Sequence, residues 1–168
     1  INSDSWIHDK DIGGGRIVGE VCHFVDFLTF MNGSLPQEVY ANVLPDSESL
    51  NDTVVINLRF SNGSIGTIAE FSNGSKALFK EYVEVYRAGS TGIIKDFRKL
   101  EIYGRGRRFK KNLMCQNKGQ KEMVRQFITS IRQGKLSPIK CEEIFAASLA
   151  TFKIAESLAT RKPAQLSW

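Results

Sequence analysis

Hydrophobic and polar residues alternate with a period of two between residues 53 and 60, which is the clearest structural signal in the chain. Every second position of this segment is apolar, namely Val54, Ile56, Leu58 and Phe60. A strand with one buried face gives this pattern. The Asn62-Gly63 pair that follows is typical of a tight two-residue hairpin turn. The sequence therefore predicts a hairpin whose second strand begins near residue 65.

The predicted turn also sets the register of that hairpin, because a shift by one residue exchanges the two faces of a strand. With two residues in the turn, the apolar positions of both strands lie on the same face. The expected cross-strand pairs are Phe60 with Ile65, Leu58 with Thr67, Ile56 with Ala69, and Val54 with Phe71.

Three segments instead repeat their apolar residues at the helical spacing. The first covers residues 17–31 and stops at Asn32-Gly33. The second runs from about residue 121 to 132, and its apolar side consists of Met123, Val124, Phe127, Ile128 and Ile131. The third covers about residues 140–160, with a predicted apolar stripe of Cys141, Phe145, Leu149 and Phe152.

Four further segments have the composition of strands: residues 36–44, 81–87, 91–103 and 107–114. Strands that follow one another through short turns favour antiparallel pairing, with helices packed against them. We therefore predict an α+β fold with an open, largely antiparallel sheet of about five to six strands and helices packed on one face. No GxGxxG segment follows a predicted strand, so a dinucleotide-binding unit is not expected within this chain.

The composition is that of a soluble globular domain. A chain of 168 residues with 42% hydrophobic and 24% charged residues is long enough to bury a core. No apolar run approaches the roughly 18 to 20 residues of a membrane span. We expect one domain over residues 1–168 and no membrane partner. Because the chain begins at Ile1 without an initiator methionine, we also expect a piece of a longer protein.

The three cysteines, Cys22, Cys115 and Cys141, are scattered and form no CxxC pair. Neither a disulfide framework nor a zinc site is indicated, so no metal is expected. Each cysteine lies in an apolar run, and we expect small buried thiols. Reduced thiols favour a cytoplasmic location.

The net charge of +5 is mild, but its distribution is uneven. Eight basic residues fall close together: Lys95, Arg98, Lys99, Arg105, Arg107, Arg108, Lys110 and Lys111. This stretch either binds an anion, such as an acidic or nucleotide-linked sugar, or forms the solvated outer face of strands. A nucleic acid partner is not expected, because few aromatic residues are interspersed and no recognised binding module is present.

The first helix has the most pointed group of polar residues. His23 lies one turn after Gly19, and Glu20 and Asp26 flank that stripe. A glycine inside a helix costs about 1 kcal/mol relative to alanine, which suggests that space above His23 is needed. A histidine beside carboxylates can exchange a proton with an alcohol or carbonyl near neutral pH. Alternatively, this histidine only forms a hydrogen bond inside the fold.

The segment that contains this helix, GGGRIVGEVCHFVDFLTFMNG, begins at Gly13. It closely resembles the start of the C-terminal domain in the glucose–fructose oxidoreductase / inositol dehydrogenase / MocA-like family. Other segments fit in the same order: the strand pair around Asn62-Gly63, residues 79–85, the Lys118-Gly119 turn and residues 155–158. The resemblance thus covers nearly the whole chain.

This resemblance implies the C-terminal substrate-binding and oligomerisation domain of an oxidoreductase that uses NAD or NADP and acts on a sugar, polyol or sugar derivative. In the family, such a domain follows an N-terminal Rossmann domain, which this chain lacks. The chain alone is therefore expected to be inactive and to hold no cofactor. The family's open sheet often forms the oligomer interface, so a homo-oligomer is expected.

The family's helix commonly reads Asp-x-x-x-His, and its histidine falls on His23, as an acid/base group or a hydroxyl ligand. The aspartate position falls on Gly19, which makes the neighbouring Glu20 the candidate second catalytic group. Expected substrate-binding residues are Gly14, Gly15, Arg16, Gly19, Trp6 and Lys80.

Two of these candidates have other interpretations. Trp6 either borders the substrate or anchors its segment, and Lys80 either reaches the pocket or is a solvated lysine at a sheet edge. Two other functions also stay open: a non-catalytic oligomerisation or ligand-binding module whose site has decayed, and cofactor-assisted glycoside cleavage.

Overall fold

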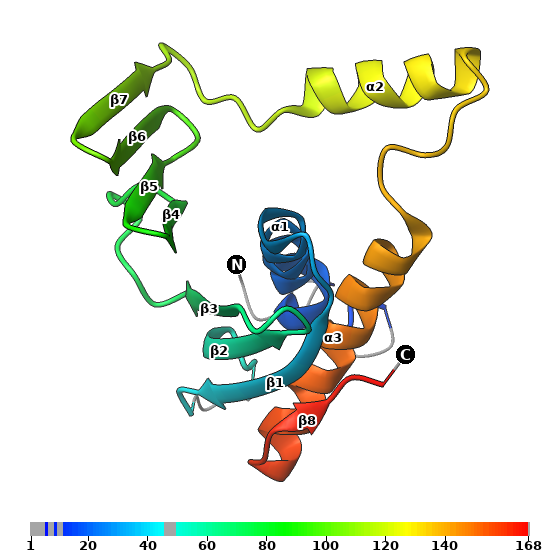
Figure 1. Ribbon diagram of the computed structural model, residues 1–168. Coiled ribbons are helices and arrows are strands. Elements are labelled where there is room, and N and C mark those ends of the chain that lie inside the picture. The colour runs from blue at the N-terminus through cyan, green and yellow to red at the C-terminus, as the bar shows by residue number, and fades with distance from the viewer. Residues whose placement is uncertain (1–5, 7–8, 10–11, 46–49, 168) are drawn as a thin grey trace. The chain divides into compact units, whose positions relative to one another are not determined.

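The computed structural model describes residues 6, 9, 12–45 and 50–167. The chain divides into two compact units (Figure 1). Unit 1 contains Ile1–Asn73 and Ile139–Trp168, and unit 2 contains Gly74–Pro138. Each unit has its own four-stranded sheet. That residues 1–168 are one domain of a longer dehydrogenase stays a prediction.

Unit 1 begins with a helical segment in two parts. The π-helical turn η2 (Ile17–Val21) continues directly into α1 (Cys22–Asn32), so the predicted helix over residues 17–31 is confirmed. Gly33 ends it in the left-handed conformation, with φ 60°, as is usual for a glycine after a helix.

The sheet of unit 1 has the order β3-β2-β1-β8, with antiparallel neighbours. Its strands are β1 (Pro36–Val43), β2 (Thr53–Phe60), β3 (Ile65–Phe71) and the short β8 (Ala164–Gln165). The last helix of the chain, α3 (Cys141–Thr160), lies with α1 on one face of this sheet (Figure 1).

The core of unit 1 lies between this sheet and the helices. The alternating residues of β2 that the sequence marks as apolar are all buried, at no more than 2% exposed. Burying one such side chain contributes about 1.5–3 kcal/mol. The helical segments contribute Val21, Val25, Ala147, Ala150 and Ile154 to the same cluster.

The inward face of α3 differs from the predicted stripe. Phe145 and Phe152 are 69% and 60% exposed, and Cys141 is exposed. Small side chains such as Ala147 and Ala150 face the core instead, because they let the helix backbone come close to the sheet and to α1. The prediction of buried thiols is wrong as well, since Cys115 is also exposed.

The β2–β3 hairpin forms as predicted, but its register differs by one residue. The loop contains three residues, 61–63, because the Phe60 N–H donates to the Ser64 carbonyl at 2.9 Å and the Gly63 N–H donates to the Phe60 carbonyl at 2.9 Å. Gly63 has φ 84°, the left-handed glycine of a three-residue hairpin loop.

This extra loop residue exchanges the faces of β3. Ile56 pairs with Ile68, and Leu58 pairs with Gly66. Ile68 is therefore the buried residue of β3, whereas Ile65 and Phe71 are 82% and 60% exposed. The four predicted pairs are wrong for this reason, although the predicted strands are present.

Unit 2 is an antiparallel meander followed by a helix. Its strands pair in chain order, β4 (Tyr82–Arg87), β5 (Ser90–Lys95), β6 (Lys99–Gly104) and β7 (Arg107–Asn112). The segment predicted as one extended stretch over residues 91–103 is two strands. Asp96 and Phe97 adopt positive φ angles of 52° and 46° and turn the chain between them.

The helix α2 (Gln120–Arg132) has the predicted apolar side, but none of its residues is buried. The α+β prediction with open antiparallel sheets is confirmed, although the strands form two sheets where one was expected. Among the residues with a described position, no helix has the length and apolar character needed to cross a membrane.

Candidate functional site

The predicted site lies at the start of the first helical segment of unit 1. Two backbone N–H groups of the preceding glycine loop, those of Gly13 and Gly14, donate to the Asp9 carbonyl at 2.8 and 2.9 Å. Gly14 and Gly15 have φ angles of 67° and 85°, which residues with a side chain rarely adopt. This loop therefore leads into the helix without side chains from its glycines.

The π-helical turn Ile17–Val21 lies immediately before His23. Such a turn is rare and recurs at functional sites, where it widens the helix locally. Gly19 is at its centre, and a Cβ placed there would meet nothing within 4 Å. The structure thus has the open space that the sequence suggested next to His23.

His23 is exposed on the first turn of α1, and Asp26 follows one turn later on the same helix. Partial burial raises the pKa of the Asp26 carboxyl, the Glu143 carboxylate raises it further, and His23 partly offsets both effects. Partial burial also raises the pKa of the Cys22 thiol, and the Glu20 and Asp26 carboxylates add to this shift. His23 therefore has acidic neighbours, and Asp26 is electrostatically coupled to it.

Sequence reasoning missed Glu143 as a neighbour of this site. It lies in the first turn of α3, and only the packing of α3 against α1 brings it near Asp26. No spacing rule connects two helices so far apart in the chain, so the sequence contains no signal for this contact.

Arg16, a predicted substrate-binding residue, has protein carboxylates as its partners. Its side chain is 9% exposed, its Nη2 donates to Glu70 Oε1 at 2.9 Å, and its Nη1 lies 3.8 Å from Asp52 Oδ2. These contacts join the helix start to the sheet. Its Nε is buried and has no hydrogen-bond partner among the described residues.

The other two candidates belong to other segments of the chain. Trp6 is 65% exposed in the segment before the glycine loop. Lys80 is exposed and belongs to unit 2, two residues before β4. The roles of both in substrate binding stay predictions. Within the described part of the chain, no group of three or more His, Cys, Asp or Glu side chains could hold a metal ion.

Comparison with protein families now identifies the domain. Residues 2–105 match the family described as GFO/IDH/MocA C-terminal domain. The chain belongs to this family. The resemblance seen in the sequence is thereby confirmed. No match was found among curated proteins.

Solved structures share the fold of this GFO/IDH/MocA domain. An NAD binding oxidoreductase from Klebsiella pneumoniae is 17% identical at a TM-score of 0.80, over 98% of this chain and 54% of that protein. An aldose-aldose oxidoreductase from Caulobacter crescentus complexed with glycerol is 13% identical at 0.80, over 99% and 52%. The UDP-N-acetylglucosamine 3-dehydrogenase GnnA from Acidithiobacillus ferrooxidans is 14% identical at 0.73, over 90% and 50%. The chain spans about half the length of these proteins.

Proposed function

We propose that this chain is the substrate-side domain of an NAD- or NADP-dependent oxidoreductase that acts on a sugar, polyol or sugar derivative. The observation that supports this most is the family match over residues 2–105. Proteins with the same fold include an NAD binding oxidoreductase and an aldose-aldose oxidoreductase. Strands β1 to β7 follow one another with no described helix between them, unlike the strand–helix–strand alternation of a dinucleotide-binding fold. A Rossmann domain outside this chain would therefore hold the cofactor, which supplies hydride transfer, and the chain alone would be inactive.

His23 is the proposed acid/base group or hydroxyl ligand. Its exposed position at the start of α1 lets a substrate hydroxyl approach the imidazole. In the oxidation direction, the imidazole would take the hydroxyl proton. Asp26 would then stabilise the protonated ring from the next helical turn. Glu20, expected for this role from the sequence, stays a second candidate.

The test uses the full-length protein with its native upstream region. Cofactor reduction is measured over a panel of sugars and polyols for the wild type, His23→Ala and the control Lys162→Gln, whose side chain is exposed just after α3. We expect His23→Ala to lower kcat by about 10²- to 10⁴-fold, the usual contribution of general acid–base catalysis. If His23→Ala turns over as fast as the control, His23 is not catalytic.

A pH profile separates proton transfer from simple hydroxyl binding. If His23 is the base, the acidic limb of kcat disappears in His23→Gln, because the titrating group is gone. If His23 only binds the hydroxyl, His23→Gln retains the limb and changes KM instead.

A non-catalytic module is the second candidate, and Gly19 favours it. The family's aspartate is missing at this position, although the open space there would accommodate a side chain. A module predicts that His23→Ala and Gly19→Asp leave cofactor reduction at the same background level. An active enzyme predicts that the two variants differ from each other and from the wild type.

We also propose that the open face of the unit 1 sheet forms a homo-oligomer interface. Ile65 and Phe71 project from that face at 82% and 60% exposed, and exposed hydrophobic side chains on one surface mark contact sites. Sedimentation should show that Ile65→Glu with Phe71→Glu dissociates the oligomer. Ile12→Glu is the matched control, because Ile12 is 72% exposed but precedes the helix. A wild type that sediments as a monomer would refute this interface.

A further inference from the structure

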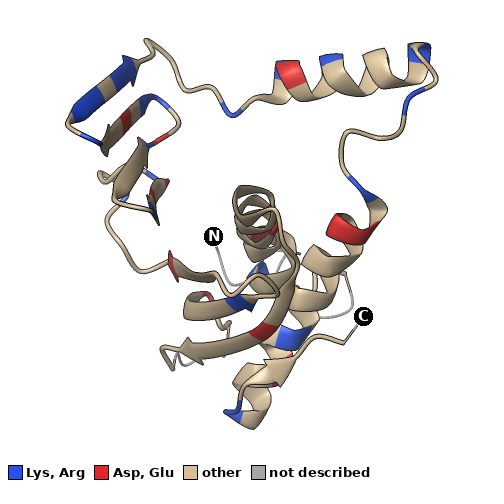
Figure 2. Ribbon diagram, viewed as in Figure 1, with Lys and Arg blue, Asp and Glu red and all other residues tan. Residues whose placement is uncertain are grey.

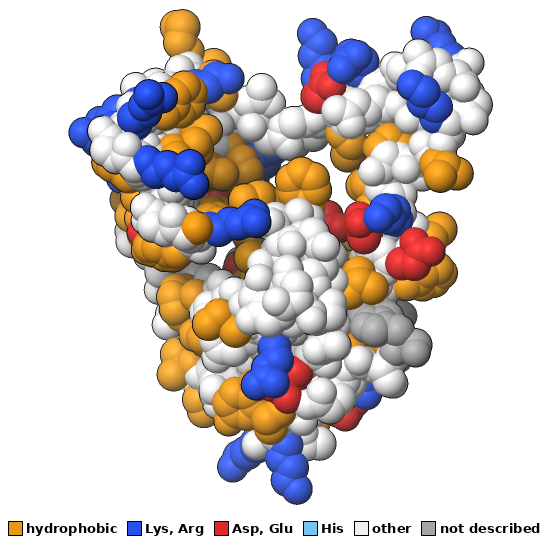
Figure 3. Space-filling model, viewed as in Figure 1, with side chains coloured by type: hydrophobic (Ala, Val, Ile, Leu, Met, Phe, Trp, Pro, Cys, Tyr) orange, Lys and Arg blue, Asp and Glu red, His pale blue; other side chains and the backbone are white. Residues whose placement is uncertain are grey.

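The net charge of +5 is the sum over two units whose net charges have opposite signs. Unit 1 has seven Lys and Arg against 13 Asp and Glu, a formal charge of −6, whereas unit 2 has 16 against five, a formal charge of +11. The basic side chains of unit 2 gather on its sheet, over β7 in particular (Figure 2, Figure 3). A surface of this charge attracts anions, and the pairing of its cations decides where an anion can be held.

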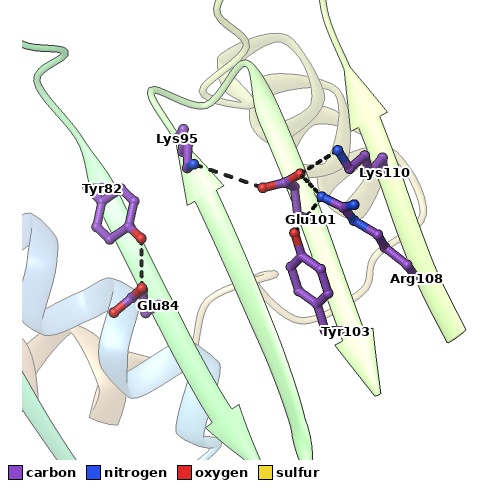
Figure 4. A network of polar contacts seen from close by, with 7 residues as sticks. All are labelled: Tyr82, Glu84, Lys95, Glu101, Tyr103, Arg108 and Lys110. Carbon is purple, nitrogen blue, oxygen red and sulfur yellow. Dashed lines mark hydrogen bonds and ion pairs between the residues drawn. The ribbon is translucent and has the colours of Figure 1, made fainter. Parts of the chain in front are cut away.

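On one face of this sheet, three cations share one protein carboxylate as their partner (Figure 4). Glu101 accepts Lys110 Nζ at 3.0 Å and Arg108 Nη2 at 3.1 Å, and Lys95 Nζ lies at 3.9 Å. These contacts hold the pKa of the Glu101 carboxyl below its usual value, mainly through the hydrogen bond from Lys110. An anion bound on this face would compete with a carboxylate.

Within the described strands β4 to β7, the opposite face has no carboxylate; Glu81, directly before β4, is paired with Lys118 at the far end of the sheet. At one end of the sheet, each strand contributes one residue to a row across it, which we call the arginine row: Arg87, Ser90, Gly104 and Arg107. Each is directly paired with the next, so the side chains project to the same face. Both arginines are exposed. Neither guanidinium forms an ion pair or hydrogen bond with any residue that the structure describes.

A hydroxyl group lies at the centre of the arginine row. A Cβ placed on Gly104 would overlap Ser90 Oγ and lie 2.9 Å from Ser90 Cβ, so the serine side chain leans over the glycine. Its hydroxyl has no partner within the described part of the chain. The two arginines are three strand spacings apart, about 14 Å between Cα atoms, and their long side chains can reach inward over Ser90.

The Arg105-Gly106 turn adds a third guanidinium next to this row. Its residues have φ angles of 49° and 71°, as in the two-residue hairpin turn that keeps Gly104 paired with Arg107. Arg105 is exposed and has no ion pair with another described residue. Within β4 to β7, the remaining side chains of this face are apolar or basic: Val83, Val85, Ile94, Leu100, Ile102, Phe109 and Lys111.

We propose that the arginine row binds the phosphate groups of a small phosphorylated ligand, the chemistry that nucleotide sugars and free nucleotides share. A guanidinium donates two parallel hydrogen bonds to phosphate oxygens, and the Ser90 hydroxyl would donate to another oxygen. One row along the same face, Phe109 and Ile102 are 52% and 41% exposed and form an apolar shelf for a base or sugar ring. A sugar on this ligand rests on the proposed oxidoreductase function, whereas phosphate binding does not.

The test is calorimetric titration of the protein with inorganic pyrophosphate, uridine diphosphate and uridine diphosphate glucose at one ionic strength. Arg87→Gln with Arg107→Gln removes two charges from the row. Lys121→Gln with Arg132→Gln removes two charges from exposed positions of α2 in the same unit and is the matched control. We expect the row variant to weaken pyrophosphate binding by about 10- to 100-fold, and Ser90→Ala by about 3- to 10-fold.

The control variant should bind pyrophosphate within about threefold of the wild type. A uridine nucleotide that binds more tightly than pyrophosphate would support the apolar shelf. Equal weakening in both double variants, or no heat with pyrophosphate, overturns the proposal. So does a thymidine oligonucleotide that binds tightly and is not displaced by pyrophosphate, because the surface then serves nucleic acid. If the full-length protein shows no turnover but still binds pyrophosphate, the oxidoreductase proposal is refuted and the phosphate-binding proposal stands.

Discussion

Gly104→Ala is the substitution whose effect the structure determines most sharply. The new Cβ would overlap Ser90 Oγ and lie 2.9 Å from Ser90 Cβ and 3.2 Å from Ser90 Cα. The last of these atoms belongs to the backbone of β5, so a rotation of the serine side chain cannot relieve the contact. Overpacking of this kind costs about 1–3 kcal/mol. The lower backbone entropy of alanine in the unfolded chain returns about 0.4–1 kcal/mol.

The matched control for this substitution is Gly92→Ala in the same sheet. A Cβ on Gly92 would meet nothing within 4 Å, so only the entropic gain remains. We therefore expect Gly104→Ala to lower the free energy of unfolding by about 1–2 kcal/mol and Gly92→Ala to raise it slightly. Thermal unfolding resolves this difference, because 1 kcal/mol shifts the Tm of a chain of this size by about 2–4 °C.

A double-mutant cycle identifies Ser90 as the cause of the loss. Ser90→Gly removes the Oγ and Cβ contacts and leaves only the 3.2 Å approach to the backbone. The double variant should therefore be more stable than the sum of the two single effects, by about 0.5 kcal/mol or more. Additive effects, or a Gly104→Ala variant as stable as Gly92→Ala, would show that the Ser90 side chain does not lie over Gly104.

Three further substitutions test unit 1. Gly19→Ala should raise the free energy of unfolding by about 1 kcal/mol in chemical denaturation, because alanine is the better helix former and a Cβ at this position meets nothing within 4 Å. A lower free energy of unfolding would show that the space at Gly19 is not open. Asp26→Asn should raise the free energy of unfolding by roughly 0.5 kcal/mol at neutral pH. Because the folded protein raises the pKa of the Asp26 carboxyl, the wild type is relatively most stable below pH 3.8, where this carboxyl is protonated in both states. That stability is lost as the pH rises through the pKa of the folded state. The advantage of Asp26→Asn over the wild type should therefore vanish in acid. Arg16→Met should cost about 1–3 kcal/mol, because Glu70 loses its partner at 2.9 Å, and Glu70→Gln in the same chain should recover part of that cost.

The sequence by itself determined most of the elements of this protein, because most have their own local period; the division into β5 and β6 and the short β8 were not predicted. The alternation of β2, the apolar run of α1 and the glycine after it depend only on neighbours in the chain, and all three are present in the structure. The family also followed from the sequence, since the order of several segments is a property of the chain and does not require packing.

Tertiary packing decided which side of each element is buried. In α3, close packing against the sheet favours alanines at the core and leaves Phe145 exposed. The spacing of residues along the helix does not predict how close the helix lies to the sheet. In the hairpin, the Phe60 N–H donates to the Ser64 carbonyl, so the loop contains three residues where two were predicted. As a result, Ile65 lies on the open face of the sheet. The turn sequence is compatible with both loop lengths, so only the structure settles the register.

The same division applies to the two candidate sites. His23 and Gly19 share one helix, so their spacing in the sequence was enough to place them together. Glu143 joins them only through the contact between two helices. Arg87 and Arg107 lie on strands at opposite edges of the sheet, and only the pairing of all four strands aligns them in one row. A sequence records the charge of such a surface, but strand pairing decides which cations meet a carboxylate and which stay free for a ligand.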